Sequence, residues 1–348
     1  MKPENTEDIL ELMNGSIHAA ALGTAMELGL FWLLAERPLS ASNVAQSLNI
    51  PLNRCHHWLG ILFQLGLLEN TPDGYAPSII AREAILNAQS QETWAFQAQE
   101  DRDSAFFVRD LALNIDKPMS TWQTQNQKLP DYFQRIQEDP SYAMSFTRKL
   151  YKIHRSLAEQ LADILDVSGV KSLLDLGGGS GVVSLALLRK QPNLTSVVVD
   201  VENVCQAGRE IALENKLEKR ITYLAADILK DDLPAGFDMV MLCDVGAFNG
   251  ILFRRIYDLL NPTGRFVIVD KFAPSRTSAP PSRLLSVFLD SLEHPSQSIA
   301  FTTTEVLQTR LQQAGFCDFS VKSVPHKDNL PWNIDWIMLE ARKQKNAV

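Results

Sequence analysis

The sequence predicts an α/β protein in which a smaller helical module precedes a mostly parallel sheet. Through residue 100, apolar residues recur mainly at helical spacing, and a single β-hairpin signal follows the helices. From Lys171 onward, short β-branched runs alternate with helical stretches, as in parallel sheets covered on both faces. We therefore expect a first domain over 1–100, a helical linker over 101–165 and an α/β domain over 166–348.

The composition favours a globular protein and counts against nucleic-acid and membrane partners. The chain has 348 residues, is 45% hydrophobic and 21% charged, and carries a net charge of −8. Its first hundred residues hold four basic residues against eleven acidic ones. An acidic surface repels phosphate groups, so we expect neither nucleic acid nor an anionic membrane as a partner.

Targeting and redox signals indicate the cytoplasm. The start, MKPENTEDIL, is acidic and polar, unlike a signal peptide. The longest apolar stretch, 17–34, is interrupted by His18 and Glu27, which favours a buried helix pair over a membrane span. The cysteines are far apart, fit no CxxC pattern and are interpreted as reduced thiols: Cys55, Cys205, Cys243 and Cys317.

The front module has the element order of a winged helix-turn-helix. Residues 7–36 predict two helices that end before Pro38, Ser40 can cap a short third helix, and Pro51 opens another. A hairpin is predicted where LLE and GYAP flank the turn TPDG.

The helix after Pro51 favours a protein partner over DNA. It carries one permanent positive charge, Arg54, and an apolar stripe that includes Trp58, Leu59 and Leu62. We expect a dimerisation module, with a DNA-binding regulator as the alternative.

Residues 101–165 contain many aromatic side chains. These residues either fill a core between domains or form a lid that lines a pocket for a planar substrate. Under the second interpretation, Trp122, Met144 and Phe146 contact the substrate.

The α/β domain opens with a glycine-rich turn between a strand and a helix. Five strands are predicted over SLLDLGG, TSVVVD, ITYLAAD, FDMVMLC and RFVIVD, and the first runs into Gly177, Gly178, Gly179 and Gly181. Glycines permit positive φ and close approach of a ligand to the backbone. The following helix N-terminus offers free N–H groups to that ligand.

Acidic residues mark the ends of the first three of these strands. Because the carboxyl ends of parallel strands meet at one edge, Asp175, Asp200 and Asp227 are expected to face one ligand rather than serve as strand caps. Asp200 can accept hydrogen bonds from both hydroxyls of a ribose. Asp227 can accept from an adenine amino group while Ile228 covers the ring. The acids predict an adenosine-containing ligand.

These motifs together resemble a known enzyme family. The loop GGGSG, with an acid two residues before it, differs from the GxGxxG of dinucleotide folds and resembles class I S-adenosylmethionine-dependent methyltransferases. The front module, the helical linker, NPTGRFVIVD and QQAGF extend the resemblance over nearly the whole chain. The chain is similar to small-molecule O-methyltransferases of the caffeate, acetylserotonin and hydroxyneurosporene type.

The resemblance implies a fold, a cofactor and an assembly. The fold is a Rossmann-like domain with a mostly parallel seven-stranded sheet and an antiparallel last strand, behind a winged-helix dimerisation domain. The assembly is a homodimer whose N-terminal module contributes to the partner's substrate pocket. The cofactor is S-adenosylmethionine, held by Asp175, Gly177, Gly178, Gly179, Asp200, Val201, Asp227, Ile228 and Cys243.

The chain departs from the family where the catalytic base is expected. After the fourth strand, Ala247 falls at the family's histidine, Phe248 at its aspartate and Asn249 at its tryptophan. Alanine cannot accept a proton, so catalysis must depend on positioning, an acidic acceptor, a relocated base or a different reaction.

Four residues are candidates for a relocated base. His294, in SLEHPSQS, falls on a pocket-lining segment of the family, although a solvated histidine before a proline is an equal alternative. Asp244 is second, and His154 and His326 are weaker candidates.

Metal catalysis is not expected. Asp244 and Asp270 end neighbouring strands, but no third ligand stands beside Asp270 in the sequence. The remaining substrate-pocket candidates are Ala247, Phe248, Asp290 and Trp332.

The sequence therefore predicts a cytoplasmic methyltransferase acting on a small aromatic or polyketide-like metabolite, most simply at oxygen. The alternative is a family member that methylates carbon or nitrogen, or that catalyses decarboxylation, cyclisation or rearrangement.

Overall fold

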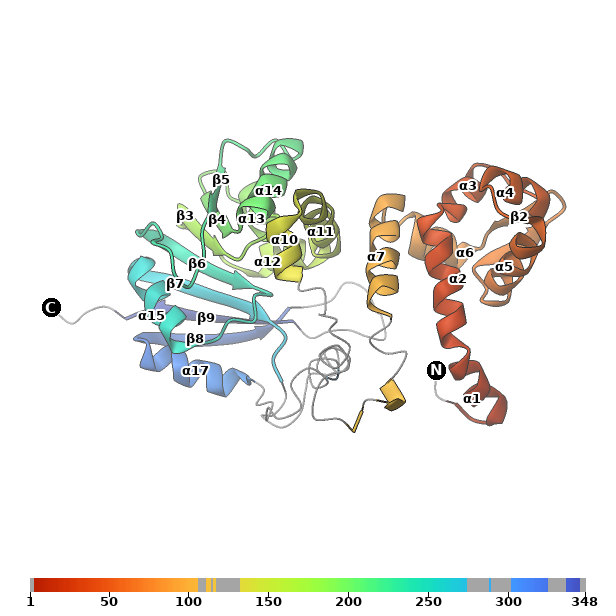
Figure 1. The fold of residues 1–348 in the computed structure, drawn as a ribbon. Coiled ribbons are helices and arrows are strands. Elements are labelled where there is room, and N and C mark those ends of the chain that lie inside the picture. The colour runs from red at the N-terminus through yellow and green to blue at the C-terminus, as the bar shows by residue number, and fades with distance from the viewer. Residues whose placement is uncertain are drawn as a thin grey trace. The chain divides into compact units, whose positions relative to one another are not determined.

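The structure is a computed structural model that describes residues 3–105, 111–113, 115–116, 132–273, 288, 302–324 and 336–344. The chain divides into two compact units, Met1–Leu113 and Asn114–Val348. Figure 1 shows the element order along the chain.

The first unit is helical and contains one hairpin. Its core combines apolar residues of several helices, including Ala25, Phe31, Leu34, Leu59 and Leu62. Its elements are α1 (Thr6–Met13), α2 (Gly15–Glu27), α3 (Leu30–Glu36), α4 (Ala41–Ser47), α5 (Leu52–Gln64), β1 (Leu68–Thr71), β2 (Gly74–Pro77), α6 (Ile79–Ala81), the π-helical turn η1 (Arg82–Leu86), α7 (Gln91–Ser104) and the 3₁₀ turn η2 (Leu111–Leu113).

Most of the front-module predictions are confirmed, and one is wrong. The hairpin pairs β1 with β2 antiparallel, and the Ser40 hydroxyl accepts from the Asn43 N–H at 3.3 Å at the start of α4. Residues 7–36, however, form three helices rather than two. Gly29, at φ +71°, ends the middle helix because its left-handed conformation interrupts the helical backbone.

None of the helices described in either unit is long and apolar enough by itself to cross a bilayer. Together, the bent pair α2 and α3 has the length and the composition of a membrane-spanning segment. Several of its apolar residues, including Ala25, Leu30 and Phe31, are however buried in the core of the first unit.

The second unit is a seven-stranded sheet in the order β5-β4-β3-β6-β7-β9-β8. β9 runs antiparallel to both of its neighbours, and the other adjacent pairs are parallel, as predicted. The strands are β3 (Ser172–Leu176), β4 (Thr195–Asp200), β5 (Ile221–Ala225), β6 (Phe237–Cys243), β7 (Leu260–Asp270), β8 (Phe316–Ser323) and β9 (Ile337–Lys343).

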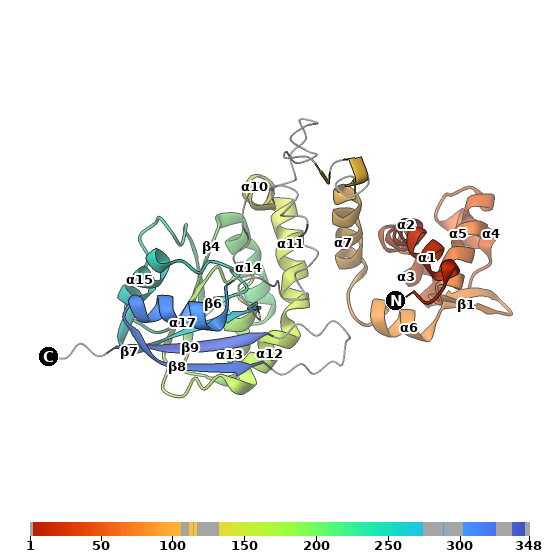
Figure 2. The same cartoon turned by 90° about the horizontal axis from the view of Figure 1, so that it is seen from below.

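Helices cover both faces of this sheet (Figures 1 and 2). Successive strand residues alternate between two cores: Leu173 packs with α12, α13 and α14, whereas Leu174 packs with α15 and α17. The helices of this unit are α10 (Tyr132–Glu138), α11 (Pro140–Ile153), α12 (Arg155–Ile164), α13 (Val182–Lys190), α14 (Glu202–Glu214), α15 (Gly250–Leu259) and α17 (Thr304–Gln313).

Candidate active site

The turn from β3 to α13 has a conformation that depends on glycine. Gly177, Gly179 and Gly181 have φ values of +65°, +57° and +72°. Gly178 lies so close to Asp175 that an added Cβ would come within 2.5 Å of the carboxylate carbon. Nothing described lies within 4 Å of a Cβ added at Gly179. The turn therefore exposes backbone beside the ends of β3 and β4.

A cavity of about 480 Å³ opens at this edge of the sheet. Helices α10 and α11 supply apolar side chains to it, and the strand ends supply polar ones. Among the residues that line it are Phe133, Ile136, Phe146, Leu150, Val182, Val183, Val199 and Val204. Most of the predicted site residues line it too: Asp175, Gly177, Gly178, Gly179, Asp200, Val201, Asp227, Ile228, Cys243, Asp244, Ala247 and Phe146.

Asp200 is fixed by two backbone donors at the end of β4. Its Oδ2 accepts from the Gly179 N–H at 2.9 Å, and its Oδ1 accepts from the Val201 N–H at 2.8 Å. Burial raises the pKa of this carboxyl, and the two N–H donors oppose that rise. Each oxygen can accept further hydrogen bonds, which suits a ligand with two adjacent hydroxyls.

Asp175 is a buried carboxylate with one unsatisfied oxygen. Its Oδ2 accepts from the Ser184 hydroxyl at 2.6 Å, while its Oδ1 has no hydrogen-bond partner among the described residues. Burial raises its pKa to about 7, the Asp200 charge adds to the rise, and the Ser184 hydrogen bond opposes it.

A second orphaned polar atom lies at the same cavity. Thr147, on α11, is 2% exposed, and its Oγ1 has no partner among the described residues. Buried polar atoms are normally hydrogen-bonded, so two such atoms on residues that line one cavity suit a polar ligand. An adenosine with an amino-acid tail fits: Asp200 for the ribose, the loop backbone close by, and Asp175 for an ammonium group.

Asp227 and Ile228 follow β5 and also line the cavity. The Asp227 Oδ1 accepts from the Leu229 N–H at 2.8 Å, and its Oδ2 pairs with the Lys230 ammonium at 3.0 Å. These donors hold the pKa of Asp227 below its ordinary value, and the Leu229 N–H makes the largest contribution. The carboxylate stays ionised, able to accept from an amino group.

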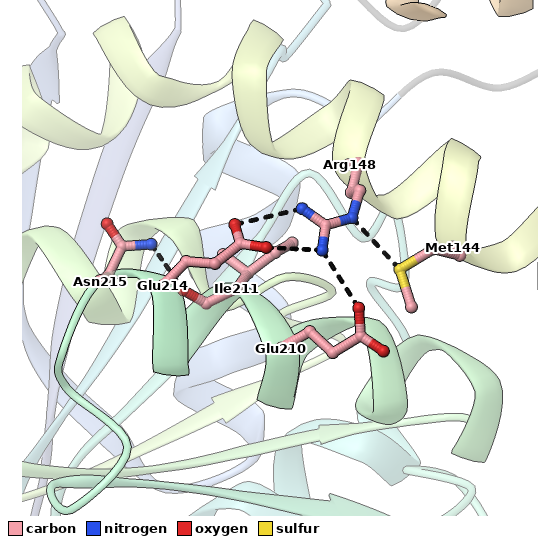
Figure 3. Close-up of polar contacts among 6 residues, drawn as sticks. All are labelled: Met144, Arg148, Glu210, Ile211, Glu214 and Asn215. Carbon is pink, nitrogen blue, oxygen red and sulfur yellow. Dashed lines mark hydrogen bonds and ion pairs between the residues drawn. The ribbon is translucent and has the colours of Figure 1, made fainter.

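Polar contacts hold α10 and α11 against α14. Arg148 of α11 donates to both oxygens of Glu214, at 3.1 and 2.7 Å, and to Glu210 at 3.1 Å (Figure 3). The Asn203 amide donates to the carbonyls of Ile136 and Gln137, both at 2.9 Å, at the end of α10. These contacts position the apolar wall of the cavity.

Three further groups gather beside the end of β6. The His154 Nε2 lies 3.6 Å from the Asp244 Oδ2, and the Lys271 Nζ lies 4.0 Å from the Asp244 Oδ1. Lys271 also stands 4.1 Å over the Trp336 ring, whose edge-on contact with His154 spans 6.0 Å between centroids. Burial lowers the pKa of His154, the Asp244 charge opposes this, and Lys271 adds to the lowering.

Some predicted residues lie elsewhere. Met144 is not among the described residues that line the cavity: its sulfur lies 3.3 Å from the Arg148 Nε (Figure 3). Phe248 is also absent from the cavity wall and packs on Phe272 at 5.5 Å between centroids. Outside the described residues lie Trp122, Asp290, His294, His326 and Trp332.

The second acid considered for a metal binds backbone instead. The Asp270 carboxylate accepts from the Lys271 N–H at 2.7 Å and from the Gly246 N–H at 3.2 Å. Across the described ranges, no three His, Cys, Asp or Glu side chains are grouped to hold an ion.

Sequence reasoning missed Thr147 and Lys271 and gave His154 a minor place. Thr147 carries no local signal, because a threonine within a helix is ordinary. His154 does have a weak sequence signal, because it stands at the break between α11 and α12, where a helix boundary frees a side chain to turn inward.

Comparison with known proteins assigns the family. Residues 119–309 match the family profile described as an O-methyltransferase domain, and residues 10–83 match the O-methyltransferase dimerisation domain. The chain belongs to the O-methyltransferase family. It is an S-adenosylmethionine-dependent methyltransferase, and the strand-end acids and glycine turn described above fit that cofactor.

Individual relatives vary in their chemistry. The chain is 30% identical to a 3-hydroxy-5-methyl-1-naphthoate 3-O-methyltransferase from Streptomyces sahachiroi, over 67% of this chain and 66% of the relative. It is 26% identical to the N,N-dimethyltransferase OxyT from Streptomyces rimosus, over 96% of both chains. The solved structure "PigF with SAH" superposes with a TM-score of 0.80 at 20% identity, covering 98% of this chain and 100% of that one, and so shares the fold.

Proposed function

We propose that this methyltransferase modifies a hydroxyl group of a small aromatic or polyketide-like metabolite. The observation that carries the proposal is the composition of the cavity. Its cofactor end is polar, with Asp175 and Asp200, and its lid side is apolar, with Phe133, Phe146 and Leu150. A planar apolar acceptor fits against such a wall. The naphthoate named for the Streptomyces sahachiroi relative belongs to this class.

The residues of this chain would act by binding and orientation. S-adenosylmethionine, when bound, supplies a methyl group on a positively charged sulfur. Asp200 would hold the ribose, Asp227 the adenine amino group and Asp175 the ammonium group. The lid side chains would orient the acceptor and exclude water, and such positioning supplies a large part of the acceleration of a two-substrate reaction.

Nitrogen methylation is the second candidate. It is supported by the OxyT relative, which is named as an N,N-dimethyltransferase and matches along 96% of both chains. Ala247, at the position of the family's base, also suits an acceptor that needs no deprotonation before attack.

Calorimetry and product mass together test the proposal. We expect S-adenosylhomocysteine to bind the wild type, to lose at least about tenfold in affinity with Asp200→Ala, and to bind Asp258→Ala normally, since Asp258 is exposed on α15. Incubation of S-adenosylmethionine with hydroxynaphthoates and with matched aminonaphthoates should then add one methyl mass to the hydroxylated probes. Methylation of the amino probes alone would favour nitrogen, and binding with methylation of neither set would refute an aromatic acceptor.

We also propose a cytoplasmic homodimer. The match to a dimerisation domain supports the dimer, and so do the exposed apolar residues of the first two helices. The four cysteines are all free thiols in the structure, which suits a reducing compartment.

A further inference from the structure

We propose that His154, paired with Asp244, is the general base of this enzyme and takes over the role that Ala247 cannot perform. The inference rests on the proposed transfer to a hydroxyl group. It is carried by the position of the pair, by an imidazole that makes no capping hydrogen bond to α12 and by the arrangement of charge around it.

The pair lies beside the cofactor loop. β6 runs parallel to β3, with Leu242 opposite Leu176, so residues 244 and 245, which follow β6, lie next to the glycine turn. A Cβ added at Gly177 would come within 3.0 Å of the Val245 side chain. Both His154 and Asp244 line the cavity. A proton acceptor at this place would lie next to a cofactor held by the glycine turn.

The His154 imidazole does not stabilise the helix boundary where it stands. The backbone N–H of His154 donates to the Leu150 carbonyl at 2.9 Å, and its carbonyl accepts from the Ala158 N–H at 2.9 Å. The side chain makes no capping hydrogen bond to α12. It is 20% exposed and lies between Asp244 and the edge of Trp336.

The surrounding charges suit a base that is neutral before the reaction and charged after it. Within the part of the chain that the structure describes, the charged groups that act on His154 are Asp244, after β6, and Lys271, after β7. Burial and Lys271 favour the neutral imidazole, while Asp244 stands ready to stabilise the imidazolium that forms. Since Nε2 faces Asp244 at 3.6 Å, Nδ1 is the ring nitrogen that would take the proton from the substrate hydroxyl. Asp244 and Lys271 are positioning residues.

The proton and the electrons balance in one displacement. The acceptor O–H bond breaks and its proton moves to Nδ1, while an oxygen electron pair forms the bond to the methyl carbon. The methyl–sulfur bond breaks with its pair kept on sulfur, so S-adenosylhomocysteine leaves as a neutral sulfide. The imidazolium then returns its proton to water.

Nuclear magnetic resonance tests the pair without any acceptor. With ¹⁵N-labelled histidine and saturating S-adenosylhomocysteine, the His154 signals are identified by their loss in His154→Gln. We expect a titration midpoint below that of an ordinary histidine, and a still lower midpoint in Asp244→Asn because the carboxylate charge is gone. Equal midpoints in the wild type and Asp244→Asn would overturn the pairing.

Kinetics test the role in catalysis. With a hydroxynaphthoate probe, His154→Gln should lower kcat by about 10²–10⁴-fold. The S-adenosylhomocysteine affinity of His154→Gln should stay at the wild-type value. The control is His57→Gln, because His57 is exposed in the first unit; its kcat and its S-adenosylhomocysteine affinity should both match the wild type. The loss should shrink with more acidic probes, which need less help to ionise. An unchanged kcat would refute the base, and a parallel loss of S-adenosylhomocysteine affinity would make His154 a cofactor ligand instead.

Together, these experiments distinguish a failure of this inference from a failure of the proposed function. If S-adenosylhomocysteine binds but no hydroxylated probe is methylated, the acceptor assignment fails, and the assignment of His154 as its base fails with it. The resonance titration still decides whether His154 and Asp244 interact.

Discussion

At the scale of single residues, the site depends on carboxylates and glycines whose cost to the apo protein is offset by the ligand. Asp175 is 1% exposed, and one of its oxygens lacks a described partner. A buried carboxylate without full hydrogen bonding destabilises the folded chain when it is ionised. Its burial at the cavity therefore suits a positively charged group on the ligand, and this yields a prediction with a definite sign.

Removing the Asp175 charge should flatten the pH dependence of stability. The pKa is raised to about 7 from 3.8, so the folded state holds the proton more tightly than the unfolded chain. The Asp175 contribution to the free energy of unfolding thus falls as pH rises from about 4 to about 7, and is constant above that. The thermal unfolding midpoint of the ligand-free protein should therefore fall between pH 4 and pH 7, roughly, and it should fall less in Asp175→Asn. Calorimetry across that pH range measures both midpoints. Asp258→Asn serves as the exposed control, and a variant profile parallel to the wild type would contradict the assignment.

Ligand affinity should respond to pH in the opposite direction. The ionised carboxylate attracts the ammonium group of S-adenosylhomocysteine, so affinity should rise towards pH 7, by up to about tenfold per unit, and then level off. Calorimetric titrations between pH 5.5 and 8, roughly spanning the midpoint, test this. An affinity independent of pH in the wild type would remove Asp175 from ammonium binding.

A methyl group at Gly178 should displace the Asp175 carboxylate. The added Cβ would come within 2.5 Å of the Asp175 carboxylate carbon, so either the side chain or the loop must move. We expect Gly178→Ala to weaken S-adenosylhomocysteine binding by about tenfold or more. Gly250→Ala, at the start of α15, has nothing within 4 Å of the new Cβ and should bind normally. Equal affinities in the two variants would show that the loop accommodates the methyl group.

At the scale of elements, α11 connects the site to the rest of the domain. One face of the helix carries Phe146, Thr147 and Leu150 into the cavity wall. Arg148 extends to α14 instead and bridges Glu210 and Glu214 (Figure 3). Because the arginine fork binds the carboxylate of Glu214 in a bidentate manner, it sets orientation as well as distance.

Replacing this arginine should loosen the cavity wall. Arg148→Met keeps an apolar stem but removes the donors to Glu210 and Glu214. We expect a loss of about 1 kcal/mol in the free energy of unfolding, because the ion pairs are partly exposed, together with a higher KM for the acceptor. Arg155→Met is the matched control, since Arg155 pairs with Glu159 at 3.9 Å within α12. Urea titration and steady-state kinetics test both effects, and equal KM values for the two variants would argue against a role for the bridge in positioning the lid.

At the scale of the whole molecule, the first unit exposes apolar side chains that its own core does not use. None of the α1 residues is buried, although Ile9, Leu10, Leu12 and Met13 lie there, and Ile17 on α2 is 56% exposed. Contiguous exposed apolar residues of this kind usually mark an interaction surface. The match to a dimerisation domain supports the proposed homodimer as the use of this surface.

Introducing acidic side chains on this surface should dissociate the dimer. We expect the wild type to sediment as a dimer and the double variant Leu12→Glu, Ile17→Glu to sediment as a monomer. Leu213→Glu, equally apolar and exposed on α14, should remain dimeric. S-adenosylhomocysteine binding should survive in the monomer, because the cavity described here is lined by residues of the second unit. A wild-type monomer would refute the homodimer.

The sheet, the glycine turn and the acids at the strand ends could all be predicted from the order of the residues. These are local properties: Leu173 and Leu174 alternate between two faces because strand geometry requires it, and Asp200 ends β4 wherever the helices pack. Tertiary packing alone brings His154 to Asp244 and Met144 to Arg148, and it leaves the Thr147 hydroxyl at the cavity with no partner among the described residues. Such contacts depend on how α11 packs against the sheet and α14, which no spacing in the sequence records.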